Sequence, residues 1–302
     1  MSTSYHVAVI GLGAMGMGAA RSCLRAGLTT YGIDLSEQAR SQLQQAGAAA
    51  VMADARPLAE TLDAVLLLVV NATQVRRILL GEEGLARHLK PGTAIMVSST
   101  IAAEEASALA VELAQLGLPM LDAPVSGGAI KADAGEMTVM AAGSDAAFDK
   151  LAPVLDAVAG KLYRVGSEPG QGSTVKIIHQ LLAGVHIAVA AEAMALASRA
   201  GVPLDLMYDV VTHAAGNSWM FENRMPRVLA GDYQARSAVD IFVKDLTLVA
   251  DTAKALRFPL PLASTALNMF LGASNAGHGQ EDDSAVIKIF SGIQLPGQED
   301  KA

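Results

Sequence analysis

The chain's first apolar run, His6-Val7-Ala8-Val9-Ile10, leads directly into Gly11-Leu12-Gly13-Ala14-Met15-Gly16. The run predicts a buried strand, and the glycine string predicts a tight turn that opens a helix. In dinucleotide-binding folds the first glycine permits the turn, the second lets backbone amides approach a pyrophosphate, and the third lets the helix pack on the strand. The same string also forms simple turns, so its context decides between the two interpretations.

Asp34 supplies that context. It closes a second predicted strand about 20 residues after the glycine string, where a carboxylate accepts hydrogen bonds from both ribose hydroxyls of NAD and repels the extra phosphate of NADP. The alternative role for Asp34 is a cap for the helix that starts at Ser36. Arg40 would still allow NADP to bind weakly. We predict NAD as the cofactor, bound by Gly11, Leu12, Gly13, Met15, Gly16 and Asp34.

The first half of the chain alternates short apolar runs with helical patterns. The predicted strands are 7–10, 30–33, 64–70, 93–97, 120–122, 138–142 and 162–165, and the predicted helices include 15–26, 36–46 and 102–116. Continuous apolar strands indicate a sheet that is covered on both faces. The alternation of strand and helix predicts a mostly parallel, doubly wound α/β sheet of the Rossmann type.

The strand signals stop near residue 165. Turn-forming residues at 166–170, Gly-Ser-Glu-Pro-Gly, predict a domain boundary there. Residues 173–200 are apolar nearly all round, which predicts a long buried helix, and further helices are expected near Pro203, Ser237 and Pro261. We therefore predict two domains: an NAD-binding Rossmann domain at 1–166 and an all-α substrate and oligomerisation domain at 167–302.

Composition narrows the class of protein. The chain has 302 residues, a net charge of −8, 52% hydrophobic residues and 17% charged residues, which is typical of a globular protein and excludes disorder. The negative charge gives no reason to expect binding to nucleic acid or to an anionic membrane. The most apolar stretches, 64–70 and 187–197, are shorter than the roughly 20 residues that span a bilayer. We predict no nucleic-acid partner and no membrane.

Cysteine and histidine usage bears on metals and on location. Cys23 is the only cysteine, which excludes an intrachain disulfide, a Cys-based zinc site and an iron–sulfur cluster. The six histidines show no ligand spacing, so we predict no metal. No export signal is visible at the N-terminus, and we expect a reducing, cytoplasmic setting.

Three further segments resemble the β-hydroxyacid dehydrogenase family, which includes 3-hydroxyisobutyrate and tartronate semialdehyde enzymes. They are Asp122-Ala123-Pro124-Val125-Ser126-Gly127-Gly128, then Gly170-Gln171-Gly172 with Lys176, and Lys244-Asp245-Leu246. With the glycine string they cover essentially the whole chain in the family's order. The resemblance implies a 6-phosphogluconate dehydrogenase-like fold and an NAD-dependent dehydrogenase that acts on a CH–OH group.

Within the family the chain is most similar to the L-threonate dehydrogenase branch, which oxidises a four-carbon sugar acid at C2 with NAD. This finer resemblance rests on segments 176–180, 213–219, 221–224 and 282–284. Most family members carry two asparagines where this chain has His179 and Gln180, which argues against the ordinary hydroxyisobutyrate substrate. The resemblance implies oxidation of L-threonate to 2-dehydro-L-erythronate, with a small-molecule sugar acid as the substrate.

The resemblance assigns the catalytic acid/base to Lys176. Oxidation of an alcohol requires a base within hydrogen-bond reach of the hydroxyl as hydride leaves. A lysine with the ordinary pKa of about 10.4 is protonated at neutral pH, but burial and the positive nicotinamide ring would both lower that pKa. We expect an alkaline optimum for oxidation. The alternative is a lysine that snorkels to the surface from a buried helix.

The other site residues follow from the same resemblance. Ser126, Gly127 and Gly128 are expected to bind the substrate carboxylate at a strand end, and His179 and Gln180 to bind further substrate hydroxyls. Thr100 is expected beside the nicotinamide ribose, with a helix N-cap as its other role, and Lys244 is expected to close over cofactor and substrate, with Asp245 orienting local groups. Further candidates for shaping the pocket are Asn217, Trp219 and Arg224.

Other functions remain open at this level. A short semialdehyde reductase would keep the fold, and imine reductases share the architecture but usually lack the lysine. 6-Phosphogluconate dehydrogenase has a similar layout but needs a larger helical domain. A non-catalytic dinucleotide-binding module would bind NAD without turnover. An apolar helical domain also predicts self-association, as a homodimer or homotetramer.

Overall fold

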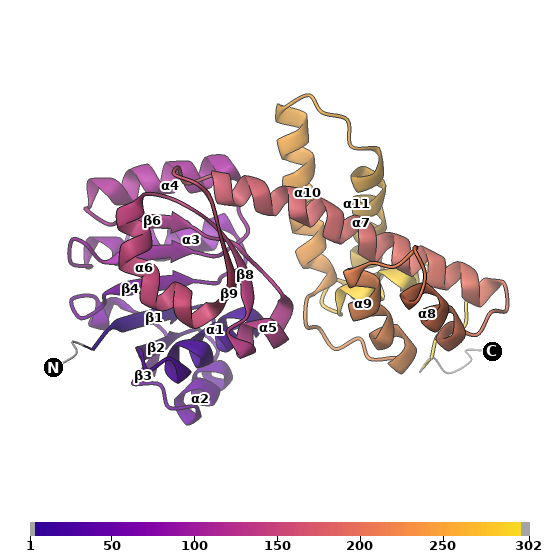
Figure 1. Ribbon diagram of the computed structural model, residues 1–302, viewed down its shortest axis with the longest axis horizontal. Coiled ribbons are helices and arrows are strands. Elements are labelled where there is room, and N and C mark those ends of the chain that lie inside the picture. The colour runs from indigo at the N-terminus through magenta and orange to yellow at the C-terminus, as the bar shows by residue number, and fades with distance from the viewer. Residues whose placement is uncertain (1–3, 297–302) are drawn as a thin grey trace. The chain divides into compact units, whose positions relative to one another are not determined.

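The alternating pattern of the first half builds a single sheet. In the computed structural model, which describes residues 4–296, nine strands pair in the order β3-β2-β1-β4-β5-β6-β8-β7, with β9 pairing to β8 (Figure 1). The strands are β1 (His6–Ile10), β2 (Thr29–Ile33), β3 (Ala50–Met52), β4 (Ala64–Leu67), β5 (Ala94–Val97), β6 (Met120–Asp122), β7 (Val125–Ser126), β8 (Met137–Ala142) and β9 (Ala159–Gly166).

Strands β1 to β6 are parallel to one another, whereas β8 runs antiparallel to β6 and β7. The predicted mostly parallel, doubly wound sheet is therefore confirmed. The sequence analysis did not predict β3 and β7, which have three and two residues.

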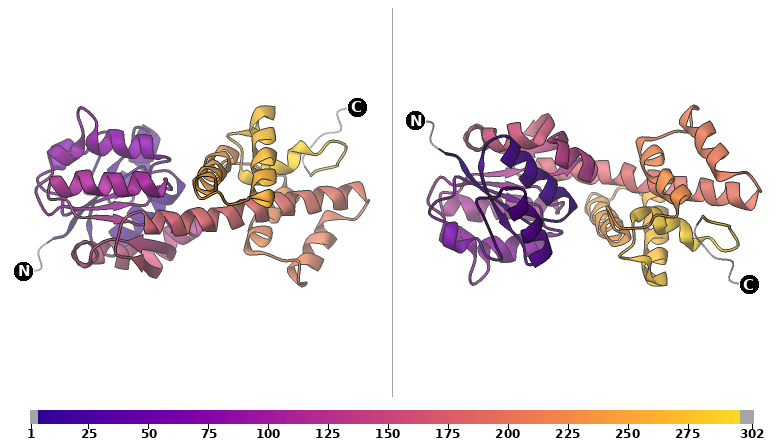
Figure 2. Two further views of the ribbon diagram at one scale, coloured as in Figure 1. Left: turned by 90° about the horizontal axis from the view of Figure 1, so that it is seen from above. Right: turned by 90° about the horizontal axis from the view of Figure 1, so that it is seen from below.

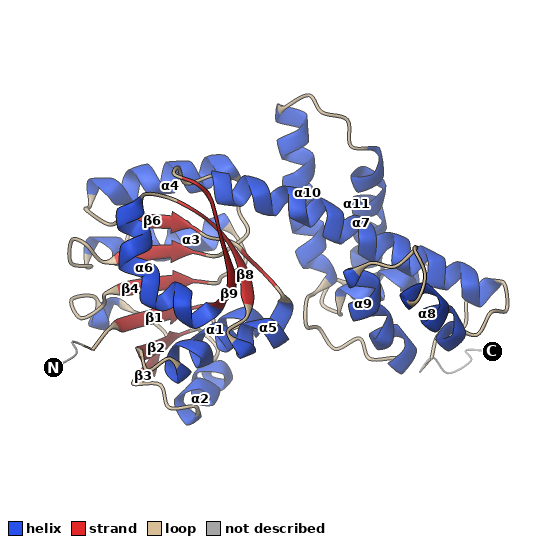
Figure 3. Ribbon diagram, viewed as in Figure 1, coloured by secondary structure: helices blue, strands red, loops and turns tan. Residues whose placement is uncertain are grey.

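Six helices of the described chain cover the two faces of this sheet (Figure 3). They are α1 (Ala14–Arg25), α2 (Glu37–Gln45), α3 (Ala72–Leu80), α4 (Ala103–Gln115), α5 (Gly128–Ala134) and α6 (Asp145–Val158), with short 3₁₀ turns η1 (Arg56–Leu58) and η2 (Leu85–Arg87). Alternate residues of each central strand belong to two separate cores: one contains α1 and α6, the other α3 and α4. Burial on both faces explains the continuously apolar strands.

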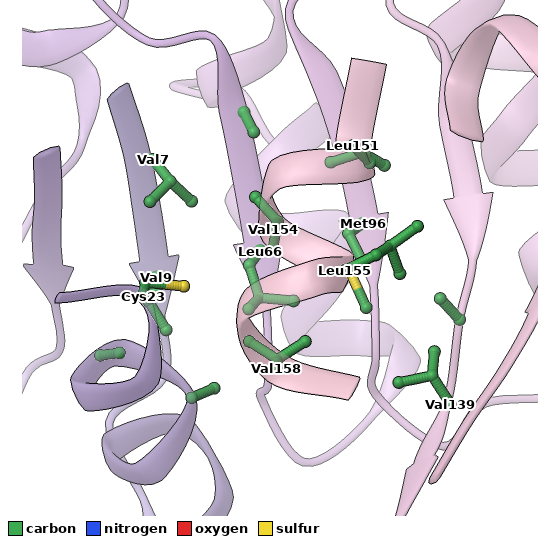
Figure 4. Packing of buried hydrophobic residues seen from close by; sticks show 14 of the residues in the cluster. Val7, Val9, Cys23, Leu66, Met96, Val139, Leu151, Val154, Leu155 and Val158 are labelled. Carbon is green, nitrogen blue, oxygen red and sulfur yellow. The ribbon is translucent and has the colours of Figure 1, made fainter. Parts of the chain in front are cut away.

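The core under α6 is tightly filled. Figure 4 shows Leu151, Val154 and Val158 of α6 against Leu66 and Met96 of the sheet, all of which are 0–1% exposed. The thiol of Cys23 lies in the same core, and burial raises its pKa to about 12. A thiol without thiolate character is unreactive, so Cys23 is a packing residue.

The described residues up to Lys176 form one compact unit, and those from Ile177 onward form a second. Helix α7 (Gln171–Arg199) continues from one into the other, and α8 (Leu204–Thr212), α9 (Trp219–Ala230), α10 (Val239–Ala255) and α11 (Pro261–Ala273) follow, with a π turn η3 (Ser274–His278) and a 3₁₀ helix η4 (Asp283–Ile289). Figure 2 shows these later helices grouped along α7. The predicted all-α domain is confirmed, although α9 was not predicted as a helix. The domain boundary at 166/167 stays a prediction.

The apolar part of helix α7 is longer than the stretches 64–70 and 187–197 that the sequence analysis identified as the most apolar. By length and composition alone its 29 residues could cross a membrane, and half of its most apolar window is buried inside the protein. The core helix of a soluble protein passes the same test, and Ile187, Ala191 and Met194 of α7 are fully buried in the core of the second unit.

Buried ion pairs join α9 to η4. Arg224 donates to Asp283 through Nε at 2.6 Å and Nη2 at 2.9 Å, and Arg227 donates to Asp282 at 2.6 Å. Burial raises the pKa of the Asp283 carboxyl even beside Arg224. Burial also acts on Asp282, but hydrogen bonds from Arg227 and Ser284 outweigh it and lower the pKa of that carboxyl.

The lowered pKa of Asp282 predicts sensitivity to acid. A carboxylate whose folded pKa lies below its unfolded value, about 3.9 for aspartate, stabilises the fold above that unfolded value, and the contribution is lost as the pH falls through the folded pKa. We expect Asp282→Asn to melt at a lower temperature at neutral pH, and to lose less stability than the original chain between about pH 5 and pH 3. Thermal unfolding followed by circular dichroism checks this, and equal losses over the acid range would contradict it.

Candidate active site

The three glycines of the first turn meet three different constraints. Gly11 has φ of +90°, and a Cβ there would lie 2.8 Å from the carbonyl oxygen of Leu68. A Cβ on Gly16 would lie 1.7 Å from the carbonyl oxygen of Gly11, so α1 packs directly on the turn. A Cβ on Gly13 would meet no protein atom within 4 Å. The open position is the one through which a pyrophosphate approaches backbone amides.

Helix α1 starts immediately after this opening. Gly13 is its N-cap, and no side chain caps the helix. The first amides of a helix carry a partial positive charge and lack partners within the helix. An uncapped, open helix start of this kind binds phosphate groups. Leu12 is buried and Met15 is half-buried beside the opening.

Asp34 follows β2 and reaches back to the glycine turn. Its Oδ2 accepts from the backbone N–H of Leu12 at 2.7 Å, and its Oδ1 accepts from the backbone N–H of Ser36 at 2.7 Å. The N-cap of α2 is Ser36 itself, whose hydroxyl accepts from Ala39. Asp34 therefore ties the start of α2 to the glycine turn and is not the helix cap. Arg40 donates to the backbone carbonyls of residues 34 and 35 at 2.7 and 2.9 Å.

The carboxyl end of β5 presents consecutive hydroxyls. Ser98 and Ser99 are 4% and 3% exposed, and neither hydroxyl has a hydrogen-bond partner within the described residues 4–296. Thr100 follows and is half-buried. The N-cap of α4 is Ala102, so the alternative role of Thr100 as that cap is wrong. Buried hydroxyls without partners at this edge of a parallel sheet mark a place where a polar ligand group fits.

The Ser-Gly-Gly segment lies where β7 meets α5. Ser126 is the last residue of β7 and is paired with Thr138 of β8. Gly127 is the N-cap of α5, and Gly128 is its first residue and is exposed. The segment was expected to follow the end of the predicted strand 120–122, and it lies instead at the end of the unpredicted β7, with Ser126 and Gly127 half-buried.

Asp122, at the end of β6, anchors the start of α7. Its Oδ2 accepts from the backbone N–H groups of Gly170 and Ser173 at 2.8 Å each, and its Oδ1 accepts from the Ser173 hydroxyl at 2.7 Å. Burial raises the pKa of the Asp122 carboxyl in spite of these bonds. A Cβ on Gly172 would lie 2.4 Å from the carbonyl oxygen of Asp122, so the helix start lies directly against the strand end.

Lys176 lies one turn beyond this anchor. Lys176 as a whole is only 6% exposed. The alternative interpretation, a lysine that extends to the surface, predicts an exposed side chain and does not match this burial. Lys176 is thus a largely buried residue on a helix whose start is held by Asp122.

In the second unit, α7 and α10 bring four polar residues together. Gln180 donates through Nε2 to Asp245 Oδ2 at 2.5 Å, and His179 Nδ1 lies 2.9 Å from Gln180 Oε1. Lys244 Nζ lies 2.5 Å from Asp245 Oδ1. The expectation that Asp245 orients local groups agrees with these contacts.

The remaining candidates are more dispersed. Asn217 donates to Glu222 at 2.5 Å, and Trp219, at the start of α9, is 51% exposed. Arg224 is occupied by the buried pair with Asp283 and by a bond to Asn223. Within residues 4–296, no three His, Cys, Asp or Glu residues gather to hold a metal ion.

Comparison with known proteins gives the family. Residues 6–166 match the NAD binding domain of 6-phosphogluconate dehydrogenase, and residues 170–290 match the NAD-binding of NADP-dependent 3-hydroxyisobutyrate dehydrogenase. The chain is 72% identical over 295 residues to an L-threonate dehydrogenase of Escherichia coli O6:H1, with 98% of each chain covered. It is 55% identical to an L-threonate dehydrogenase of Cupriavidus necator, with 98% and 99% covered. The chain belongs to the β-hydroxyacid dehydrogenase family.

A solved structure gives the same result for this β-hydroxyacid dehydrogenase. The crystal structure of a 3-hydroxyisobutyrate dehydrogenase from Salmonella typhimurium is 70% identical, covers 95% of this chain and 100% of its own, and superimposes with a TM-score of 0.92. The predicted family, the Rossmann and all-α architecture, NAD as cofactor and an NAD-dependent dehydrogenase are confirmed.

The open position at Gly13 yields a test of the cofactor site. Gly13 has φ of −66°, which alanine tolerates, and nothing in the chain obstructs a Cβ. We expect Gly13→Ala to leave the unfolding midpoint unchanged and to lower kcat/KM for NAD about 100-fold, because the methyl group displaces the pyrophosphate by about 1 Å. The control is Gly272→Ala on α11, also without a close contact. Unaltered NAD kinetics in Gly13→Ala would contradict this placement.

The sequence analysis missed two features of the site. The anchoring role of Asp122 depends on a contact with residues 48 to 51 positions later in the chain. Ser98 and Ser99 received no role, although polar residues directly after a fully buried strand are a usable signal for a ligand site at that edge.

Proposed function

We propose that this β-hydroxyacid dehydrogenase oxidises L-threonate at C2 to 2-dehydro-L-erythronate, with Lys176 as the general acid/base. The observation that carries the proposal is the burial of the lysine residue Lys176, 6% exposed, near the anchored start of α7. The likeness to L-threonate dehydrogenases over nearly the whole chain supports the substrate.

Lys176 accepts the proton of the C2 hydroxyl at its Nζ. When bound, NAD supplies the acceptor for the hydride from C2. The amine must be uncharged to take the proton, and a dry, cationic environment favours that form. In the reverse direction the ammonium returns the proton to the carbonyl oxygen. Ser126, Gly127 and Gly128 bind the substrate carboxylate, and His179 and Gln180 face the remaining hydroxyls.

The cofactor is held by residues of the first unit. Gly11, Gly13 and Gly16 shape the turn, with Leu12 and Met15 beside it, and the N-terminal amides of α1 bind the pyrophosphate. Asp34 binds the ribose hydroxyls and disfavours NADP. Thr100 lies by the nicotinamide ribose, and Lys244 closes over cofactor and substrate.

A spectrophotometric screen of NADH formation tests the proposal. The panel consists of L-threonate, D-erythronate, D-glycerate and 3-hydroxyisobutyrate, each with NAD and with NADP. We expect L-threonate with NAD to give the highest kcat/KM. A preference for 3-hydroxyisobutyrate would overturn the substrate, faster reduction of tartronate semialdehyde would favour the reductase alternative, and NAD binding without turnover would favour the non-catalytic module.

We further propose that the protein is a cytoplasmic homodimer or homotetramer. Its single, buried cysteine supports a reducing location. Exposed apolar residues form a stripe along α7: Ile178, Leu182, Val189 and Leu196 are 53–68% exposed. Their spacings of four, seven and seven residues place them on one face of the helix.

A second copy of this chain is the occupant that fits the stripe. Exposed Glu192 lies on the same face, and a charged side chain is costly in lipid. A two-fold interface buries the same stripe of both copies against each other.

Leu182→Glu is therefore expected to shift the protein to a smaller species in size-exclusion chromatography with light scattering. The matched control is Val111→Glu, on α4 and 62% exposed, which should leave the assembly intact. An unchanged mass for Leu182→Glu would exclude the stripe as the interface.

A further inference from the structure

Asp245, Gln180 and His179 form a hydrogen-bonded chain in the second unit. Asp245 is 2% exposed and Gln180 is 7% exposed, so these contacts are shielded from water. Gln180 Nε2 lies 2.5 Å from Asp245 Oδ2, and Gln180 Oε1 lies 2.9 Å from His179 Nδ1. The three groups join helices α7 and α10.

The carboxylate sets the direction of every bond in the chain. Lys244 Nζ lies 2.5 Å from the other oxygen of Asp245, and a carboxylate paired with an ammonium only accepts hydrogen bonds. Gln180 must therefore present its NH₂ group to Asp245, and its carbonyl oxygen faces His179. Since that oxygen is also only an acceptor, His179 Nδ1 must carry a proton.

The proton on Nδ1 fixes the tautomer of the His179 imidazole. A neutral histidine carries one ring proton, so protonated Nδ1 leaves Nε2 with a lone pair that accepts hydrogen bonds. Without the carboxylate the amide could turn over, and either tautomer would satisfy the contact. The buried Asp245 removes this freedom through Gln180.

We propose that Asp245 and Gln180 are positioning residues that hold neutral His179 in the Nδ1–H tautomer, so that Nε2 accepts a hydrogen bond from a substrate hydroxyl beyond C2. This inference rests on the proposed function, in which the substrate is a polyhydroxy acid. A hydroxyl donates to a fixed acceptor, whereas an acid with hydrogen at that carbon leaves the acceptor unsatisfied. Sites built to bond a hydroxyl discriminate strongly against analogues that lack it.

The tautomer is measurable directly. Nitrogen-15 NMR of the full chain labelled at histidine, with His179→Asn used to assign the signal, distinguishes a protonated from an unprotonated ring nitrogen. We expect Nδ1 protonated and Nε2 unprotonated in the original chain at a pH where the ring is neutral. In Gln180→Met we expect loss of this single tautomer. A protonated Nε2 in the original chain would overturn the proposal, whether or not the variant folds.

The role of Nε2 is tested by a pair of substitutions and a pair of substrates. In His179→Asn the amide keeps a donor near the position of Nδ1, and in His179→Gln an amide oxygen can reach the position of Nε2. The substrates are L-threonate and 2-hydroxybutanoate, which lacks the hydroxyls on C3 and C4.

We expect His179→Asn to lower kcat/KM for L-threonate by about 10- to 100-fold, the size expected when a buried polar group loses its partner. The loss for 2-hydroxybutanoate should be less than about threefold, and His179→Gln should recover part of the activity on L-threonate. Equal losses on both substrates, or no recovery by glutamine, would overturn the role of Nε2.

Failure of this inference is distinguishable from failure of the proposed function. The NMR measurement needs no substrate, so it decides the tautomer even if L-threonate is not oxidised. Absence of L-threonate oxidation by the original chain refutes the proposed function, and with it the substrate part of the inference. Suppose that the Nδ1–H tautomer is fixed but that His179→Asn loses activity equally on L-threonate and on 2-hydroxybutanoate. That result would refute the inference and leave the proposed function standing.

Discussion

Lys176→Met is expected to lower kcat for L-threonate oxidation by about 10²- to 10⁴-fold, the contribution of general acid–base catalysis. Methionine keeps an unbranched apolar stem in the buried position but has no group that can take a proton. NAD affinity should change little, because the cofactor residues lie on other elements. Steady-state NADH formation gives kcat, and fluorescence titration gives NAD affinity.

Lys176→Arg separates proton transfer from charge. A guanidinium keeps the positive charge but is not deprotonated in proteins. We expect the arginine variant to be as inactive as the methionine variant, and the original chain to gain rate as the pH rises. An arginine variant that retains most of the activity would mean that residue 176 binds substrate by charge and is not the base.

Arg224→Met is expected to destabilise the second unit by about 3–5 kcal/mol, because it leaves the fully buried Asp283 carboxylate without its partner. The guanidinium is nearly as buried, with 9% of its side chain exposed. Two parallel hydrogen bonds to one carboxylate are a strong, specific arrangement. Urea unfolding, followed by circular dichroism and by the fluorescence of Trp219, measures the loss.

The matched control is Arg236→Met. Arg236 pairs with Asp232 at 2.7 Å, but the side chains are 45% and 38% exposed. Exposed pairs contribute about 0–1 kcal/mol. A similar, small effect of both substitutions would show that the Arg224–Asp283 pair does not stabilise the fold.

The part of the site that depends on local patterns could be predicted from the sequence. The glycine turn has a fixed spacing after a strand, and the structure gives Gly11, Gly13 and Gly16 the three distinct constraints expected of them. Asp34 was placed at the end of its strand, but its bond to Leu12 was not foreseen. The long apolar helix was also recognisable, because its residues are apolar nearly all round, which indicates a helix buried on most sides.

The part of the site that depends on contacts between distant segments could not be predicted from the sequence. Arg224 was expected to shape a pocket, yet its side chain is committed to Asp283, 59 residues later. The hydrogen bonds of Asp122 to the start of α7 likewise join segments far apart in the chain. Spacing along a chain carries no information about such partners. Strands β3 and β7, with three and two residues, were missed as well.

The most direct test of the account is a crystal structure of the protein with NADH and L-threonate bound. The measured quantity is the distance from Lys176 Nζ to the C2 oxygen of the substrate. The account predicts a hydrogen bond of about 2.6–3.2 Å, with the hydrogen on C2 directed at the nicotinamide ring. An amine beyond hydrogen-bond reach of that oxygen, with another side chain in its place, would contradict it.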